Sequence, residues 1–323
     1  MNEKAAALVK NADIRLAMLG MVEGNGHPYS WSAMFNGYDP AEMASCPYSA
    51  IPAYLDREPK DTLRIPGARV THIWTDDPGD ARRVAKASLI PNVVARPEDV
   101  IGQVDAVIVA TDRGNEHVER CRAFVETGLP VFVDKPLADN EDDLRTFAAW
   151  VAGGRPVLSS SCMRYCKEFI PFRESTCDLG TVRFAVITTP KSWERYGIHA
   201  LEGVYPIIGP GFVSAGNTAS DGKNIVHFEH ITGASVVAAA IDDMYGSFGV
   251  LDLCGTLGNA HAVFSDTFYA FRAQLAAFIG YLRTGVRPFP FGETIELMKM
   301  LIAGIRSREL GGAEVRLDDI LPD

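Results

Sequence analysis

Short apolar runs alternate with helical patterns through the first half of the chain. The apolar runs predict buried strands at 13–20, 68–77, 105–112, 130–136 and 155–161. Between them, apolar residues three and four positions apart predict helices at 79–88, 116–128 and 141–154. Strands that are buried on both faces and alternate with helices indicate a parallel, doubly wound sheet, so an α/β fold of Rossmann type is predicted.

The pattern changes later in the chain. Residues 38–67 hold five prolines and little periodicity, which predicts an extended insertion beside the site. After about residue 160, strands joined by short turns are predicted at 180–190, 224–241 and 247–264, followed by helices at 267–285 and 293–310. Short connections favour an antiparallel sheet.

This organisation predicts two domains. Residues 1–160 form a Rossmann dinucleotide-binding domain that carries the insertion 38–67. Residues 161–323 form an α+β domain with a largely antiparallel, open-faced sheet, which binds substrate and forms the oligomer.

Composition narrows the classes of partner. The chain has 323 residues, of which 47% are hydrophobic, and a formal net charge of -10. Such a surface repels nucleic-acid phosphates and anionic lipid, and the longest apolar stretch, 234–241, is too short to span a membrane. The cysteines are scattered, which is typical of reduced thiols. We predict a cytoplasmic protein without nucleic-acid or membrane partners.

A glycine-rich turn follows the first predicted strand. Dinucleotide-binding folds have glycines there, so that the backbone can approach a pyrophosphate at a helix N-terminus. Counted from Gly20, the strict G-x-G-x-x-G spacing fails. Gly24 and Gly26 can form a looser phosphate loop with His27 at the helix start, and a plain glycine-rich turn is the alternative.

The second predicted strand ends in acids. An acid at this place binds the ribose hydroxyls of NAD and repels the 2′-phosphate of NADP, so Asp76 favours NAD. Asp76 or Asp77 alternatively caps the following helix. Arg82 and Arg83 keep NADP open as the cofactor.

Polar side chains follow the third and fourth predicted strands. They are Thr111, Asp112 and His117 after the third strand, and Asp134, Lys135 and Pro136 after the fourth. Because such sheets bind ligands beyond the carboxyl ends of their strands, the two clusters are predicted to converge on one crevice. Lys135 there is either a proton-transfer group or a structural lysine, and Pro136 allows a cis peptide bond.

Several segments together resemble the glucose–fructose oxidoreductase, inositol dehydrogenase and MocA family, abbreviated Gfo/Idh/MocA. The A-T-P segment of that family, its following histidine and its strand ending E-K-P-L-A correspond to VATDRGNEH (109–117) and VDKPLA (133–138). YGIHALEGVYPIIG (196–209) resembles its histidine segment, and SSSCMRYCKEF (159–169) its arginine-bearing turn. The resemblance covers most of the chain.

The resemblance implies an NAD(P)-dependent oxidoreductase of sugars, cyclitols or their derivatives. Lys135 matches the lysine near the nicotinamide and the reacting hydroxyl, and His199 matches the acid/base histidine. Three features depart from the family pattern, and the first is the altered glycine fingerprint after the first strand. Asp134 replaces the commoner glutamate, and Arg195 stands four residues before His199, where the family often has an aspartate. A cation there disfavours the imidazolium and suits an anionic substrate.

Further polar residues complete the candidate site. Glu194 or Glu202 is a candidate for the missing carboxylate, and Arg164 and Tyr165 either contact substrate or pair locally. The predicted substrate-binding residues are Arg164, Tyr165, Arg195 and Glu202. The predicted cofactor-binding residues are Gly20, Gly24, Gly26, His27, Asp76, Thr111, Asp112, His117, Asp134 and Pro136.

No metal site is predicted. Cys162 and Cys166 lack a second pair of ligands. On a strand, His227 and Glu229 share a face while His230 points away from it.

We therefore predict an NAD(P)-dependent dehydrogenase or reductase acting on the CH–OH groups of a sugar, cyclitol or related polyhydroxylated molecule. A homodimer or homotetramer is expected, because an open-faced sheet suits an interface. One alternative retains its cofactor and uses transient oxidation for epimerisation, elimination or glycoside cleavage. Another is a non-catalytic nucleotide- or sugar-binding protein, since fold alone does not secure activity.

Overall fold

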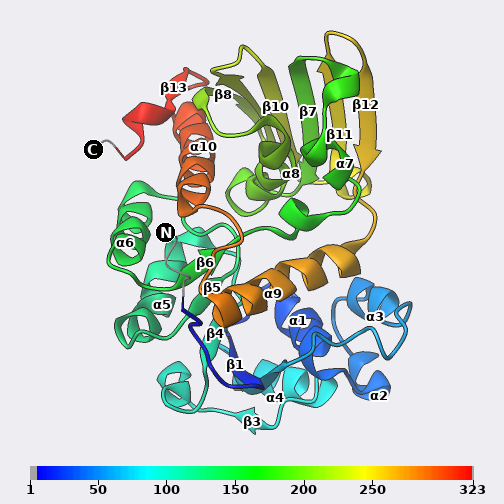
Figure 1. The fold of residues 1–323 in the computed structure, drawn as a ribbon, viewed down its shortest axis with the longest axis vertical. Coiled ribbons are helices and arrows are strands. Elements are labelled where there is room, and N and C mark those ends of the chain that lie inside the picture. The colour runs from blue at the N-terminus through cyan, green and yellow to red at the C-terminus, as the bar shows by residue number, and fades with distance from the viewer. Residues whose placement is uncertain (1–5, 322–323) are drawn as a thin grey trace.

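A computed structural model describes residues 6–321, which form two domains, each built on one sheet (Figure 1). The first sheet is parallel, with strand order β3-β2-β1-β4-β5-β6. Its strands are β1 (Ile14–Leu19), β2 (Ala68–Trp74), β3 (Asn92–Val93), β4 (Ala106–Val109), β5 (Val131–Val133) and β6 (Val157–Ser159). The predicted doubly wound sheet is thus confirmed. Its order reverses between β1 and β4, the point at which such sheets bind ligands.

Helices cover both faces of this sheet. Core side chains of α5 (His117–Glu126) and α6 (Glu141–Ala152) pack on one face. Those of α1 (His27–Asn36), α4 (Pro78–Ala87) and α9 (Thr267–Thr284) pack on the other. The predicted helix-capping role is confirmed for Asp77. Its carboxylate caps α4 by accepting a hydrogen bond from the Gly79 N–H.

Helix α9 belongs to the second half of the sequence but packs on the first domain (Figure 1). Its buried Phe278 contacts Phe132 of β5 at a ring-centroid distance of 5.4 Å. The backbone carbonyl of Leu282 accepts hydrogen bonds of 2.9 Å from both Leu8 and Val9 near the N-terminus. The chain therefore leaves the first domain and returns to it, while the boundary at residue 160 stays a prediction.

The insertion 38–67 is less extended than expected. It contains two short helices, α2 (Pro40–Met43) and α3 (Ala50–Leu55). Prolines are tolerated in the first turn of a helix, where the N–H has no helical partner, and Pro40 stands at such a position. The Asp39 side chain accepts hydrogen bonds from two backbone N–H groups of α2 and caps it.

The second sheet has strand order β12-β11-β7-β10-β9-β8-β13 and is mostly antiparallel, as predicted, with one parallel pair between β7 and β10. Its strands are β7 (Val182–Pro190), β8 (Phe212–Ser220), β9 (Lys223–His230), β10 (Ser235–Ile241), β11 (Val250–Gly255), β12 (Asn259–Val263) and β13 (Val315–Arg316). Helices α8 (Ile198–Ile208) and α10 (Phe291–Glu309) pack on its inner face.

Short helical turns link these elements. They are η1 (Pro97–Val100), η2 (Gly114–Glu116), η3 (Cys162–Tyr165), α7 (Ile170–Glu174), η4 (Cys177–Leu179), η6 (Tyr245–Ser247), η7 (Leu317–Asp319) and the π-helical turn η5 (Trp193–Gly197). No helix between residues 6 and 321 is long and apolar enough to cross a membrane.

The outer face of the second sheet is partly apolar. Phe184 of β7, Ile225 of β9 and Val263 of β12 are exposed on alternating positions of their strands. Such a face is suited to an interface between copies, so the homodimer or homotetramer stays a prediction.

Candidate active site

The polar residues that follow β4 and β5 lie together at the carboxyl edge of the first sheet. Thr111, Asp112, Asp134 and Lys135 are all buried there. His117 at the start of α5 links the two loops, since its Nε2 lies 2.8 Å from the Thr111 carbonyl oxygen and its Nδ1 lies 3.2 Å from the Leu137 carbonyl oxygen. The two clusters that the sequence places after neighbouring strands thus form one wall.

The glycine-rich turn needs its glycines. Gly20 and Gly24 have φ of +84° and +79°, a region that residues with a side chain rarely adopt. A Cβ on Gly20 would lie 2.6 Å from the Thr111 side chain. A Cβ on Gly26, the residue before α1, would lie 2.6 Å from both Tyr48 and Ile51 of the insertion. The turn therefore lets the backbone pass close to its neighbours, as a phosphate loop requires.

A cavity of about 200 Å³ opens beside Gly20, at the ends of β1, β2 and β4. It is lined by Leu19, Gly20, Trp74, Pro97, Glu98, Val109, Glu119, Arg120, Ala123 and Phe124. Asp76 lies at its rim, where its carboxylate pairs with Arg120 at 2.9 Å and faces the Met21 N–H at 3.5 Å. An apolar slot next to an acid fits the adenine and ribose of a dinucleotide.

Asp134 is fully buried and links the end of β5 to the loop before α1. Its Oδ2 accepts a hydrogen bond of 3.0 Å from the Asn25 side chain and lies 2.5 Å from His27 Nδ1. The His27 ring stacks on Trp31 of α1 with ring centroids 4.3 Å apart. Asp134 therefore fixes the loop before α1 against the end of β5.

Lys135 is held by groups from both domains. Its ammonium, with a side chain only 2% exposed, donates a hydrogen bond of 3.1 Å to the Arg195 carbonyl oxygen. It also lies 3.6 Å from Asp112 Oδ2 and 4.3 Å above the centre of the Tyr196 ring. The peptide bond between Lys135 and Pro136 is cis. A buried ammonium needs such partners, because removing the charge from water is costly.

His199 lies on the other wall, in the first turn of α8. Its Nδ1 is 2.7 Å from Ser161 Oγ, and its ring meets Tyr196 edge-on with centroids 4.8 Å apart. Burial first, and the positive charge of Lys135 second, lower the pKa of His199 well below its ordinary value. The ring is therefore neutral at neutral pH and able to accept a proton.

Arg195 points across the cleft at Asp112. Its Nη2 donates hydrogen bonds of 2.7 and 2.9 Å to the two carboxylate oxygens and one of 3.1 Å to the Glu23 carbonyl oxygen. Burial alone would raise the pKa of Asp112, but the charge of Lys135 and the hydrogen bonds of Arg195 outweigh it and lower that pKa. Asp112 is thus a carboxylate at neutral pH.

Arg164 and Glu202 contact each other. The Arg164 guanidinium pairs with Glu202 of α8 and, at 2.7 Å, with Glu293 of α10, and the Ser161 N–H donates to Glu202 at 3.0 Å. This network joins the end of β6 to two helices of the second domain, and half-buried Tyr165 follows it. Substrate binding by Arg164, Tyr165 and Glu202 stays a prediction.

Sequence reasoning missed two residues of the cleft, Lys191 and Tyr196. The Lys191 ammonium donates a hydrogen bond of 2.7 Å to the Tyr196 hydroxyl and lies 3.5 Å from the Gly24 carbonyl oxygen. Lys191 also has φ of +63°, which is uncommon for a residue with a side chain and concentrates at functional sites. Neither a backbone angle nor a π-helical turn such as η5 has a recognisable signature in one sequence.

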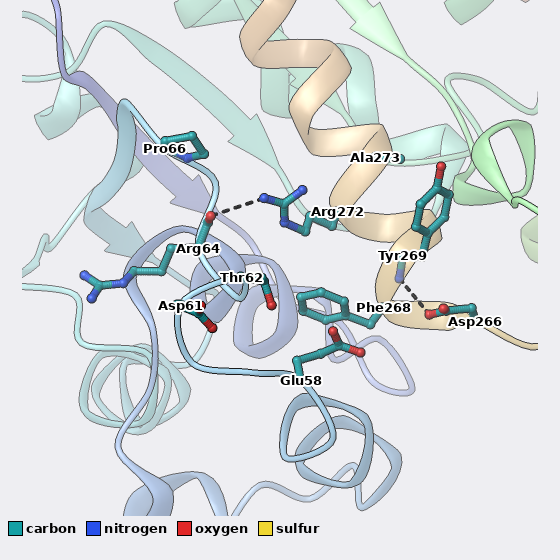
Figure 2. Close-up of a pocket in the computed structure, with 10 residues that line it drawn as sticks. All are labelled: Glu58, Asp61, Thr62, Arg64, Pro66, Asp266, Phe268, Tyr269, Arg272 and Ala273. Carbon is teal, nitrogen blue, oxygen red and sulfur yellow. Dashed lines mark hydrogen bonds between the residues drawn. The ribbon is translucent and has the colours of Figure 1, made fainter.

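A larger cavity of about 600 Å³ lies away from these groups (Figure 2). It is lined by Glu58, Asp61, Thr62, Arg64, Pro66, Asp266, Phe268, Tyr269, Arg272 and Ala273. Figure 2 shows these side chains between the insertion and the start of α9, where Arg272 points toward the Arg64 carbonyl oxygen. The residues predicted from the sequence do not line it. Nor is any group of three or more His, Cys, Asp or Glu side chains within residues 6–321 arranged to hold a metal ion.

The structure thus combines a parallel sheet of Rossmann type with a second, open-faced sheet, and Lys135 and His199 both contact Tyr196 between them. The profile of the Gfo/Idh/MocA family, described as an oxidoreductase family with an NAD-binding Rossmann fold, matches residues 50–154. Residues 50–154 of the chain therefore match the NAD-binding Rossmann domain of that family.

Individual relatives agree with this placement. Inositol 2-dehydrogenase 1 of Saccharopolyspora erythraea is 42% identical over 105 residues, which cover 31% of this chain and 31% of that protein. The chain therefore matches about a third of the length of that curated relative. Myo-inositol dehydrogenase of Lactobacillus casei, solved in complex with NAD(H) and myo-inositol, has a TM-score of 0.72 at 14% identity, covering 94% of this chain and 96% of that one.

A second solved structure extends the likeness of fold. GenD2 from gentamicin A biosynthesis, in complex with NAD, has a TM-score of 0.70 at 14% identity and covers 98% of this chain and 99% of that one. At such identities the likeness shows the fold, so the roles of individual residues depend on the geometry of this chain.

Proposed function

We propose that the chain is an NAD-linked oxidoreductase that interconverts a hydroxyl and a carbonyl group of a sugar, cyclitol or related polyhydroxylated molecule. The observation that carries the proposal is that a buried ammonium, Lys135, and a neutral buried imidazole, His199, both contact Tyr196 beside the carboxyl edge of the parallel sheet. The nicotinamide ring of bound NAD would supply the hydride acceptor.

The two side chains suit different parts of the proton transfer. His199 is neutral and, when Nδ1 carries the hydrogen toward Ser161, its Nε2 is free to accept the hydroxyl proton. Lys135 offers N–H donors to the substrate oxygen and stabilises negative charge that develops there. Tyr196 contacts both groups and keeps them on the same side of the cleft.

A substrate panel tests the proposal directly. We expect reduced nicotinamide to accumulate when the purified protein is given NAD and neutral cyclitols, sugars or the corresponding sugar acids. The acids belong in the panel because Arg195 and Lys191 add positive charge to the cleft. Absence of turnover with every polyol, together with absence of NAD or NADP binding by calorimetry, would instead favour a non-catalytic protein.

The cofactor preference follows from Asp76. We expect NAD to be used with a kcat/KM at least about tenfold above that of NADP, because the carboxylate can bind ribose hydroxyls and repels a 2′-phosphate. Asp76→Ser should narrow this ratio by about tenfold and also release Arg120, its ion-pair partner, to face a phosphate. Steady-state kinetics with both cofactors measure the ratio.

The matched control for Asp76 is Asp142→Ser. It breaks another exposed Asp–Arg pair, with Arg145 on α6, and should leave the cofactor ratio unchanged. A preference for NADP in the unaltered protein would contradict the assignment of Asp76.

A retained cofactor is the second candidate, and one feature favours it. The glycine-rich turn is covered from two sides, by Tyr48 and Ile51 of the insertion and by Lys191 and Arg195 of the second domain. Such a cover slows release of a bound nucleotide. Nucleotide that stays with the protein through extended dialysis would support a reaction by transient oxidation, and free exchange would oppose it.

A further inference from the structure

A buried cation, Lys135, and a half-buried one, Arg195, share one carboxylate in the cleft. Asp112 is the one carboxylate within 4.0 Å of the Lys135 ammonium among residues 6–321. Arg195 contacts both members of that pair, since its guanidinium bonds Asp112 while its backbone carbonyl accepts from Lys135. Lys135, Asp112 and Arg195 therefore all contact one another. Lys135 and Asp112 belong to the first domain, and Arg195 belongs to the second.

The neighbouring acid does not serve this purpose. Asp134 directly precedes Lys135, but its side chain accepts hydrogen bonds from Asn25 and the Lys135 backbone N–H and lies against His27. Its carboxylate is therefore directed away from the Lys135 ammonium, and the negative charge that faces that ammonium comes from Asp112.

The other charged and titratable groups around this point are mainly cationic or neutral. They are Asp134, His27, Cys162, Lys191, Arg195, Tyr196 and His199. A buried ammonium among such groups needs a carboxylate beside it, because removing its charge from water is costly. Asp112 is that carboxylate.

We propose that Asp112 is the positioning residue of Lys135: it compensates the charge of the buried Lys135 ammonium and directs that group at the substrate oxygen, while Arg195 holds Asp112 in place. The carboxylate thus comes from the end of β4 and not from the turn before His199, where the family resemblance led us to expect it. The kinetic test of this proposal rests on the proposed function. The spectroscopic test does not depend on it.

A purely structural role is the alternative. Asp112 and Arg195 lie in different domains, so their ion pair would also hold the domains together without affecting Lys135. The two roles differ in what restores function. An aspartate at position 195 cannot rebuild an Asp–Arg pair, but it returns a carboxylate to the vicinity of Lys135, because the backbone of residue 195 already contacts the ammonium.

The kinetic test uses Asp112→Asn and the double variant Asp112→Asn/Arg195→Asp. We expect Asp112→Asn to lower kcat by at least about tenfold with a smaller change in KM, and to move the alkaline limb of the kcat profile about one pH unit or more toward lower pH. The double variant should recover kcat by about tenfold and move the limb back. A structural role predicts no recovery.

The spectroscopic test needs no turnover. The ε-carbon resonance of Lys135, assigned with Lys135→Met in selectively labelled protein, reports the loss of its ammonium proton during a pH titration. We expect that loss at lower pH in Asp112→Asn than in the unaltered protein. This arm remains decisive if the substrate panel finds no activity, so failure of the proposed function and failure of the present proposal are distinguished.

Asp105→Asn is the matched control. Asp105 precedes β4 at the opposite edge of the same sheet and pairs with Arg15 at 3.0 Å, so the change removes an Asp–Arg pair far from the cleft. It should leave the pH profile and the Lys135 titration unchanged. The proposal is overturned if Asp112→Asn leaves both pH dependences where they are, or if the double variant performs no better than Asp112→Asn.

Discussion

Lys135→Met is expected to abolish most dehydrogenase activity while NAD still binds. Methionine fills a similar volume but cannot donate a hydrogen bond or carry charge, so the substrate oxygen loses its cationic partner. We expect kcat to fall roughly 10²- to 10⁴-fold, the range typical of a proton-transfer or charge-stabilising group. Steady-state kinetics with the best substrate of the panel, and calorimetric titration with NAD, measure the two effects separately.

Lys167→Met is the control for this variant. Lys167 is half-exposed and pairs with Asp266 near the start of α9, so its loss removes one lysine without touching the cleft. It should retain normal kcat. Full activity of Lys135→Met, or loss of NAD binding equal to the loss of turnover, would contradict a role for Lys135 at the reacting oxygen.

His199→Asn is expected to have an effect of similar size on alcohol oxidation. Asparagine can keep the hydrogen bond to Ser161 Oγ but cannot accept and hold a proton. We expect kcat to fall about 10²-fold or more. Because burial and the Lys135 charge lower the pKa of His199, the neutral base persists below the ordinary histidine value of about 6.5, and its protonation reduces kcat only at still lower pH.

The pH profile of kcat for oxidation therefore separates this assignment from others. In the unaltered protein we expect no loss of rate between pH of about 7.5 and about 6.5. His261→Asn, on exposed β12, should behave like the unaltered protein. An acid limb centred above about 6.5, retained in His199→Asn, would show that another group is the base.

The first domain could be foreseen because its signals are local. Each strand of the parallel sheet is an uninterrupted apolar run, and each intervening helix has its own periodicity and capping residues, such as Asn140 before α6. Polar clusters at successive strand ends then have to meet, since parallel strands share an edge. The buried positions of Asp112 and Lys135 follow from that rule.

The second domain was less predictable. The segment 196–209 is apolar nearly all round, and α8 is buried on almost every side, so no amphipathic period marks it as a helix. Strand β8 carries Gly216 and polar Asn217, which weaken a strand pattern, but Asn217 is buried and bonded to Asn224 and to the Gly304 carbonyl oxygen. Tertiary partners, absent from a local window, decide both elements.

The pairing of Asp112 with Arg195 lies beyond sequence reasoning altogether. The two residues are 83 positions apart and belong to different domains. An arginine four residues before His199 predicted only a cation near the base. Which carboxylate pairs with Arg195 depends on how the two sheets pack against each other.

The return of α9 to the first domain has a consequence for synthesis of the chain on the ribosome. Phe278 and the Leu282 carbonyl complete the packing of the first sheet and anchor the N-terminal segment. The part of one face that α9 covers therefore stays exposed until residues 267–284 have emerged, although the strands of the sheet are complete by Ser159. The nascent first domain therefore stays partly folded until the second domain has been synthesised. Its exposed apolar surface is then a target for chaperones.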